Sequence, residues 1–361
     1  MTQARQEQTH MVADPAGVVL GRLMGDFAAT AGVVLTALGR RLGLWDALAA
    51  GPARAEVVAE RASAALPYVR EWLRSQAAAG YVGYDPAAQT FGLAPGVAAV
   101  LGQGPLSGLA DGMAAQFAVW WSQLDRYEAA FRTGEGIPWG TFPAAHAEGM
   151  DMITRAVVAP ALVAQWLPAV DGIVARLSAG AAVADVGCGY GAACIAMAGA
   201  FPASRFTGFD IDDASVARAR RAALAAGTAE RVSFEVAAAA NICGGPYDLV
   251  TFIDSLHDLG DPVGALRRAR QVLAADGVVL LAEHAGSGKL EENLHPAGRF
   301  FYAASALVCV PNALADEHAG APLGSIPGEQ SLRRVASAAG FSRVRRVAAD
   351  APLNLLLELG L

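Results

Sequence analysis

The chain has 361 residues, of which 54% are hydrophobic and 17% are charged. Disordered chains are poor in apolar residues and rich in charge, so this composition predicts a folded protein, long enough for two domains. The formal net charge is −7 and the pI is near 5.4. This acidic balance argues against a protein that grips nucleic acid through its phosphates.

The cysteines and the apolar stretches together predict a cytoplasmic protein that does not associate with membranes. No cysteine lies in a CxxC pair or near two histidines at zinc-finger spacing, so we expect free thiols in a reducing compartment. The polar N-terminal segment lacks the apolar centre of a secretory signal, and residues 27–39 and 300–315 are too short to cross a bilayer. The four cysteines are Cys188, Cys194, Cys243 and Cys309.

The first third of the chain predicts helices followed by a hairpin. After a tail over 1–16, the apolar periodicity and the turn residues indicate helices over 17–50, 53–62 and 67–79, then strands over 81–84 and 90–93.

This order of elements is typical of a winged helix-turn-helix, which we place at 17–105. Its helix 67–79 would be the recognition helix if the domain binds DNA. The segment shows no basic cluster, which favours a role in dimerisation and in capping the substrate.

Residues 106–175 are again predicted to be helical and to form a linker that caps the substrate site. They contain Trp120, Trp121 and Trp139. These side chains either line a substrate pocket or fill gaps among small side chains.

The chemistry-bearing motif begins at residue 182. A short apolar strand, 182–186, runs directly into a loop with Gly187, Gly189 and Gly191; a helix and a second strand ending in Asp210 follow. Glycines let a backbone approach a ligand where a Cβ would clash, and the acid stands roughly 20 residues after the loop, where it can accept ribose hydroxyls.

Two cofactors fit such a unit: a dinucleotide and S-adenosylmethionine. The glycine spacing is GxGxG and not the GxGxxG of a dinucleotide site, and Asp185 precedes the loop. A carboxylate at this point repels a pyrophosphate and suits a cationic ligand. The sequence therefore favours S-adenosylmethionine.

Further strands and one helix continue the alternating pattern and define a domain over 176–361, with an insert at about 285–330. We expect them at 232–236, 247–254, 263–273 (the helix), 277–283, 342–347 and 354–358.

Residues 182–283 resemble the class I S-adenosylmethionine-dependent methyltransferases, on the segments DVGCGYG (185–191) and FTGFD (206–210). The whole chain is similar to bacterial small-molecule methyltransferases with an N-terminal winged helix, and to the plant-type O-methyltransferases, which dimerise through that domain. The resemblance implies a Rossmann-like fold with a mostly parallel seven-stranded sheet, and a homodimer.

The resemblance also implies cofactor contacts. Asp185 and the three loop glycines would hold the methionine part, Asp210 the ribose, and Ile211 the adenine face. The usual polar adenine contact is replaced by alanines here, so Asn241 is the substitute candidate, and Asp254 is a further cofactor candidate.

For the methyl transfer, the resemblance makes His257 the general base, oriented by Asp258 or Asp254. His284 is a second catalytic candidate, whereas Glu283 and Tyr302 are candidate substrate contacts. A metal held by His257, His284 and His295 has only a generic spacing, and we expect no metal.

The sequence thus predicts methyl transfer to a small-molecule acceptor, on O, N or C, in secondary metabolism. The alternative is a transcriptional regulator whose core senses the cofactor while its winged helix binds DNA.

Overall fold

The computed structural model describes residues 15–317 and 319–361, so most of the expected tail lies outside the described residues. The chain divides into two compact units, Met1–Ala114 and Ala115–Leu361. The predicted linker start at residue 106 falls close to this division, which lies inside one helix, α6 (Ser107–Ser122).

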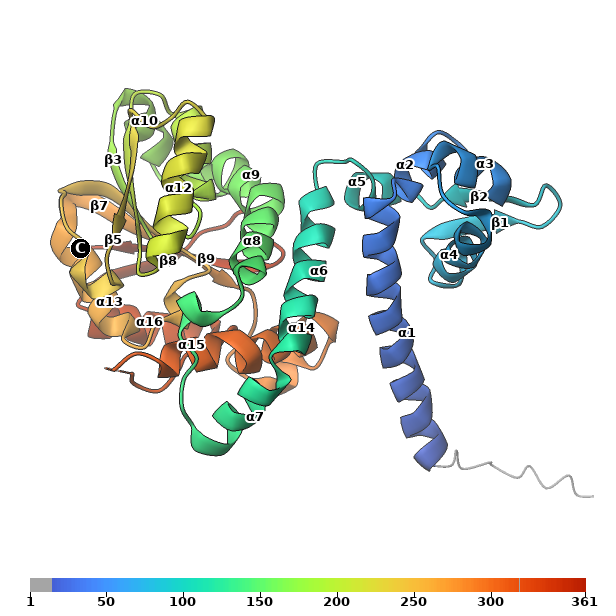
Figure 1. Ribbon diagram of the computed structural model, residues 1–361. Helices are drawn as coiled ribbons and strands as arrows, with labels where there is room; N and C mark the ends of the chain where they lie inside the picture. Colours follow the sequence, from blue (N-terminus) through green and yellow to red (C-terminus); the bar gives the residue numbers. More distant parts are fainter. Residues whose placement is uncertain (1–14, 318) are drawn as a thin grey trace, which may run out of the picture. The chain divides into compact units, whose positions relative to one another are not determined.

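The first unit consists of five helices and one hairpin (Figure 1). The helix expected over 17–50 begins at Pro15 and is interrupted at Gly43, whose φ of 67° lies in the left-handed region. The elements of the first unit are α1 (Pro15–Arg41), α2 (Leu44–Ala49), α3 (Ala55–Arg61), α4 (Leu66–Ala78), β1 (Val82–Asp85), β2 (Thr90–Leu93) and α5 (Val97–Leu101).

Two tryptophans organise the core of this unit. The rings of Trp45 and Trp72 meet edge to face with centroids 4.7 Å apart, an arrangement favoured by the ring quadrupoles. Their indole nitrogens donate to the carbonyls of Thr36 and Leu35 on α1, which ties the long helix to the winged-helix core.

A helical region precedes the sheet of the second unit. It contains α7 (Leu124–Thr133), η1 (Trp139–Thr141), and a continuous helical run made of α8 (Ala144–Ile153), η2 (Thr154–Val158), α9 (Ala159–Ala161), η3 (Leu162–Trp166) and η4 (Leu167–Ala169), followed by α10 (Ile173–Ala179).

The second unit is built on a seven-stranded sheet in the order β5-β4-β3-β6-β7-β9-β8. All pairings are parallel except those of β9, as predicted. The strands are β3 (Ala182–Val186), β4 (Arg205–Asp210), β5 (Val232–Val236), β6 (Tyr247–Ile253), β7 (Leu273–His284), β8 (Arg343–Arg346) and β9 (Asn354–Gly360).

Each strand sends alternate side chains into two separate apolar cores. Val183 packs in the core formed with α10, α11 and α12, whereas Ala184 packs in the core formed with α13 and α16. This period of two places helices on both faces of the sheet (Figure 1). The covering helices are α11 (Ala192–Ala200), α12 (Asp213–Ala225), α13 (Pro262–Val272) and α16 (Gly328–Ala338).

The strand order reverses between β3 and β6. Ligands of open α/β sheets bind outside the carboxyl ends of the strands at such a switch point. The predicted glycine loop follows β3 and the His-Asp pair follows β6, so the fold brings both motifs to this one edge. The remaining short elements are η5 (Ala239–Asn241), η6 (Leu256–Asp258), η7 (Leu290–Asn293), α14 (Pro296–Ala304), η8 (Ser305–Cys309) and α15 (Val310–Leu314).

Two helical runs among the described residues are long and apolar enough to cross a membrane, Pro15–Arg41 and Ala144–Ala169. The first is longer than the apolar stretch 27–39 that we judged too short, because the helix continues to Pro15. The second places Leu162 and Trp166 in the core of the sheet. Core helices of soluble proteins and N-terminal signal sequences pass the same test of length and composition.

Gly208, in the middle of β4, allows a test of how tightly the residues under the glycine loop are packed. A Cβ on Gly208 would lie 2.5 Å from the Phe234 ring and 2.8 Å from the Cys188 sulfur. We expect Gly208→Ala to lower the free energy of unfolding by about 1–3 kcal/mol through overpacking. In denaturant titrations, the control Gly199→Ala should be neutral or stabilising by about 0.5–1 kcal/mol, since its Cβ would meet nothing within 4 Å. Equal stability of the two variants would contradict this packing.

Candidate active site

The loop after β3 consists largely of glycines because its backbone turns where side chains do not fit. Gly187, Gly189 and Gly191 have φ values of 74°, 53° and 80°. A Cβ on Gly187 would lie 2.6 Å from the Cβ of Ser255, and one on Gly191 would lie 2.4 Å from the Phe234 ring. At Gly189 it would meet nothing within 4 Å. The middle of the loop therefore faces open space and offers bare backbone to a ligand.

A buried carboxylate lies beneath this loop. Asp185 is 2% exposed; its oxygens accept from the Thr251 hydroxyl at 2.7 Å and the Cys194 thiol at 3.6 Å. Burial raises the pKa of Asp185 to about 6. Within residues 15–317 and 319–361, Asp185 makes no ion pair with a cationic side chain. Its charge would be compensated by a cationic ligand in the loop, although both of its oxygens already have protein partners.

The acid that ends β4 faces the same loop. The carboxylate of Asp210 accepts from the amide of Gly189 at 2.7 Å and from that of Asp212 at 3.0 Å, while burial raises its pKa. Beside it, the apolar side chain of Ile211 is 68% exposed. Asn241, on η5, is also exposed. Among these candidates, Asp210 contacts the loop directly, whereas Ile211 and Asn241 are exposed after β4 and after β5.

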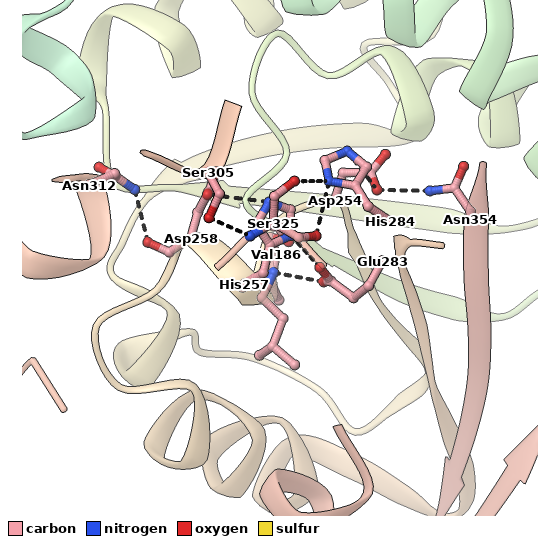
Figure 2. Close-up of polar contacts among 12 residues, drawn as sticks. Val186, Asp254, His257, Asp258, Glu283, His284, Ser305, Asn312, Ser325 and Asn354 are labelled. Carbon is pink, nitrogen blue, oxygen red and sulfur yellow. Dashed lines mark hydrogen bonds and ion pairs between the residues drawn. The ribbon is translucent and has the colours of Figure 1, made fainter. Parts of the chain in front are cut away.

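At the end of β6 a histidine is locked between two carboxylates. The Nδ1 of His257 contacts Glu283 Oε2, and Glu283 Oε1 accepts from the amide of Leu256 at 2.9 Å (Figure 2). On the other side of the ring, Nε2 lies 3.3 Å from Asp258 Oδ1. Burial alone would lower the pKa of His257, but Asp258 and Glu283 raise it well above its ordinary value. The two carboxylates therefore favour the imidazolium form of the ring.

Of the two acids expected beside His257, Asp258 lies there, at Nε2, but the acid at Nδ1 is Glu283, which was not expected in this role. Asp254, one of the two acids we expected beside His257, instead accepts from the Asn354 amide at 2.8 Å. Glu283 was expected at the substrate. It is fully buried instead, and its two oxygens contact the Leu256 amide and the ring of His257. The reason is the register of β6 and β7, which pairs Ile253 with Ala282 and places Glu283 opposite the η6 turn.

The second histidine has the opposite electrostatic character. His284 Nδ1 lies 2.7 Å from the Ser325 hydroxyl, and its Nε2 lies 3.6 Å from Asp254 Oδ1 (Figure 2). Its ring stacks on Phe301. Burial and the nearby charge of His257 lower its pKa to about 3. Its side chain is 19% exposed, against 2% for His257. His284 is thus a neutral imidazole with more access to solvent.

The three tryptophans do not act as one group. Trp120 packs against Phe300 with centroids 6.1 Å apart, and Trp139 packs edge to face against His146 at 4.7 Å. Trp121 is 74% exposed. Trp120 and Trp139 therefore belong to an aromatic layer of the second unit, whereas Trp121 faces solvent.

A hollow of about 320 Å³ lies between α7 and the α14–α15 segment. Tyr302 lines it, and the Tyr302 hydroxyl also accepts from the Asn293 amide at 2.9 Å. His295 uses its ring to cap α14: its Nδ1 accepts from the Gly298 amide, while its own amide donates to the Asn293 carbonyl at 2.8 Å. The structure therefore does not assemble His257, His284 and His295 into one metal site.

Several residues of this site carried no signal that singled them out in the sequence. Thr251, Ser325 and Asn354 gain their roles only through contacts with Asp185, His284 and Asp254. Asn312 likewise donates to the carbonyl of Asp258 and accepts from the amide of Trp139. Glu283 could have been found as a partner of His257, since the ends of neighbouring parallel strands meet at one edge.

Comparison with known proteins agrees with this geometry. Residues 184–279 match a family model described as a methyltransferase domain, and residues 29–103 match one described as an Rv2258c-like winged HTH domain. These matches confirm the predicted resemblance to winged-helix methyltransferases, the fold class and the enzyme class.

Solved structures share the fold over nearly the whole chain. The mitomycin 7-O-methyltransferase MmcR is 20% identical with a TM-score of 0.67, covering 96% of this chain and 99% of its own. Human N-acetylserotonin methyltransferase in complex with SAM is 18% identical with a TM-score of 0.67, covering 97% and 99%. CalO1, a methyltransferase in calicheamicin biosynthesis with SAH bound, is 18% identical with a TM-score of 0.67, covering 97% and 100%.

Proposed function

We propose that this chain, which carries a methyltransferase domain behind a winged helix-turn-helix domain, transfers the methyl group of S-adenosylmethionine to a small-molecule acceptor in secondary metabolism. The observation that carries the proposal is the open glycine loop above the buried Asp185, whose charge has no cationic partner among the described side chains. The solved structures with SAM or SAH bound, and those named for mitomycin and calicheamicin, support the same cofactor and the same kind of acceptor.

The residues of the loop fit each part of this cofactor. Gly187, Gly189 and Gly191 leave room for the methionine part, Asp185 supplies negative charge below it, and Asp210 faces the position of the ribose. The exposed side chain of Ile211 offers an apolar surface for the adenine, with Asn241 as a candidate polar contact. The bound cofactor supplies an activated methyl group on a sulfonium, so the chain has to position the acceptor and, where needed, take its proton.

Within this proposal His257 is the proton acceptor. Glu283 contacts Nδ1 of His257, so in the neutral ring Nδ1 carries the proton and the lone pair lies on Nε2. Nε2 faces Asp258. Because Glu283 and Asp258 favour the protonated ring, His257 acts as a base only in the fraction of molecules in which it has lost this proton. His284 is the second candidate, since it is neutral and more accessible. Trp120, Trp139 and Tyr302 are the candidate acceptor contacts.

The charges of the recognition helix favour the enzyme over the regulator. Arg70 Nη2 lies 2.6 Å from Glu56, and Arg74 Nη1 lies 2.6 Å from Glu71. Both arginines are thus partly neutralised on the face that would meet DNA phosphates, and the acidic net charge of the chain adds to this.

The proposal includes a cytoplasmic homodimer formed through the long first helix. Apolar side chains of α1 are exposed along its length, which is unusual for a solvated helix. Their exposed fractions are 65% for Leu20, 42% for Leu23, 65% for Met24, 62% for Phe27 and 59% for Val34.

The cofactor assignment predicts that Asp210→Ala weakens S-adenosylmethionine binding tenfold or more. Hydrogen bonds to a charged group contribute about 1.5–3 kcal/mol each, and the variant also loses the acceptor that fixes the Gly189 amide. Calorimetry with the exposed Asp213→Ala as control measures this. Transfer of labelled methyl to small molecules of a cell extract tests the activity itself, and unchanged affinity in Asp210→Ala would remove the ribose assignment.

The base assignment predicts a rate that rises with pH through a pKa above the usual histidine value of about 6.5, because Glu283 and Asp258 stabilise the imidazolium. In metal-free buffer, His257→Ala should lose this limb and about 10²–10⁴ in rate with little change in cofactor affinity. Glu283→Gln should move the limb to lower pH, since one of the two negative charges is gone. Loss of the limb in His284→Ala instead would make His284 the base.

The dimer assignment predicts that a charge placed on the exposed face of α1 separates the protomers. Leu20→Lys with Phe27→Lys should sediment as a folded monomer, while the wild type sediments as a dimer at micromolar concentration. Tyr68→Lys is the control, since this side chain is 81% exposed on α4. A monomeric wild type would contradict the proposed dimer.

A further inference from the structure

A thiol completes a compact group of three donor atoms beside the proposed base. Cys309 is the last residue of the π-helix η8, a rare helical form that often marks functional sites. One ring nitrogen of His257, one carboxylate oxygen of Asp258 and the sulfur of Cys309 all lie within 4.8 Å of one another. His257 is 1% exposed and Cys309 is 4% exposed, so this group lies in the interior.

The surroundings of His257 resemble those of a metal-binding histidine. Metal-ligating histidines donate their second ring nitrogen to a carboxylate, which fixes the ring, and Glu283 occupies that position at Nδ1 of His257. The Nε2 atom is thereby left facing Asp258. Asp258 Oδ1 is buried and has no hydrogen-bond partner, although it lies 3.3 Å from that nitrogen. This contact is an ion pair only while His257 is protonated; beside the neutral ring, a buried carboxylate oxygen without a partner is costly unless a ligand satisfies it.

The donor set favours one class of ion. Thiolate, imidazole and carboxylate together are ligands of Zn²⁺, whereas Mg²⁺ and Ca²⁺ prefer oxygen alone. Tetrahedral Zn²⁺ with bonds of about 2.0–2.3 Å needs ligand atoms roughly 3.3–3.8 Å apart, so small side-chain rotations would suffice. The negative charges of Asp258 and the Cys309 thiolate offset the charge of the ion in this buried place. On binding, the Cys309 thiol proton and the Nε2 proton of the His257 imidazolium both leave to solvent.

We propose that His257, Asp258 and Cys309 bind a single Zn²⁺ ion, with the fourth position open, and that this binding inhibits the enzyme. The metal takes the Nε2 lone pair of His257 that the acceptor's proton otherwise takes, so the two uses exclude each other. The inhibition rests on the function proposed above, whereas the binding of Zn²⁺ does not.

Binding is tested on the full chain by competition between the protein and a chromophoric chelator for Zn²⁺. We expect Cys309→Ala to weaken binding at least ~100-fold, and Glu283→Gln, which loses the outer partner, by about 10–100-fold. Cys243→Ala is the matched control, because this thiol is exposed and its neighbour is Glu235 at 3.3 Å. Equal Zn²⁺ affinity of the wild type and Cys309→Ala would overturn the site.

Cobalt gives a signature that a structural role of Cys309 would not produce. With Co²⁺ in place of Zn²⁺, the wild type and Cys243→Ala should show the thiolate-to-cobalt charge-transfer band and the d–d bands of a tetrahedral ion. Cys309→Ala should lack the charge-transfer band. A wild-type spectrum without that band would overturn the assignment of Cys309 as a ligand.

The activity measurement separates this proposal from the proposed function. One equivalent of Zn²⁺ should abolish methyl transfer in the wild type, a chelator should restore it, and Cys309→Ala should keep its metal-free rate at the same Zn²⁺ concentration. Equal inhibition of both proteins, or a rate raised by Zn²⁺, would overturn the inhibitory role. A chain without methyl transfer under metal-free conditions would contradict the proposed function, while chelator competition and the cobalt spectrum still decide the site.

Discussion

The meeting of the carboxyl ends of β3 and β6 at one edge of the sheet is the constraint on which the candidate site depends. The parallel pairing of these strands places the glycine loop beside the turn that carries His257, and the contact between Gly187 and Ser255 leaves no room for a Cβ between them. The hydroxyl of Ser255 donates to the carbonyl of Val186 at 2.7 Å, which ties the two segments together. A ligand in the loop is therefore held close to the chemistry after β6 by backbone geometry.

The same edge gathers more buried negative than positive charge. Burial raises the pKa values of Asp185, Asp210 and Asp254, the last to about 7, and Glu283 lies fully buried against His257. Desolvated carboxylates are costly, so such a site gains most from ligands that bring positive charge. A sulfonium cofactor at the loop and a divalent ion at His257 satisfy this requirement at two different points of the edge.

The strands of the sheet could be predicted from the sequence because each strand is indicated by a few consecutive residues. The bounds of β3, β4 and β5 follow from short apolar runs between turn residues, and the structure places them at the same residues. Asp258, next to His257 in the chain, was predicted as its partner, whereas the contact of Glu283 with Nδ1 depends on strand order, register and side-chain direction. Cys309 is even less local, because a π-helix turns it toward residues about fifty positions earlier.

Under the proposed function, the charges of the site also order its steps. Glu283 and Asp258 flank His257 and raise its pKa, which favours the protonated ring, and a protonated imidazole accepts no proton. A positive charge bound at the neighbouring glycine loop disfavours the imidazolium and lowers the pKa of His257. Cofactor binding therefore moves the base toward its neutral, active form, and the limb of kcat against pH should lie below that of kcat/KM, which reports the free enzyme. The two carboxylates thus keep His257 unable to accept a proton until the site is filled.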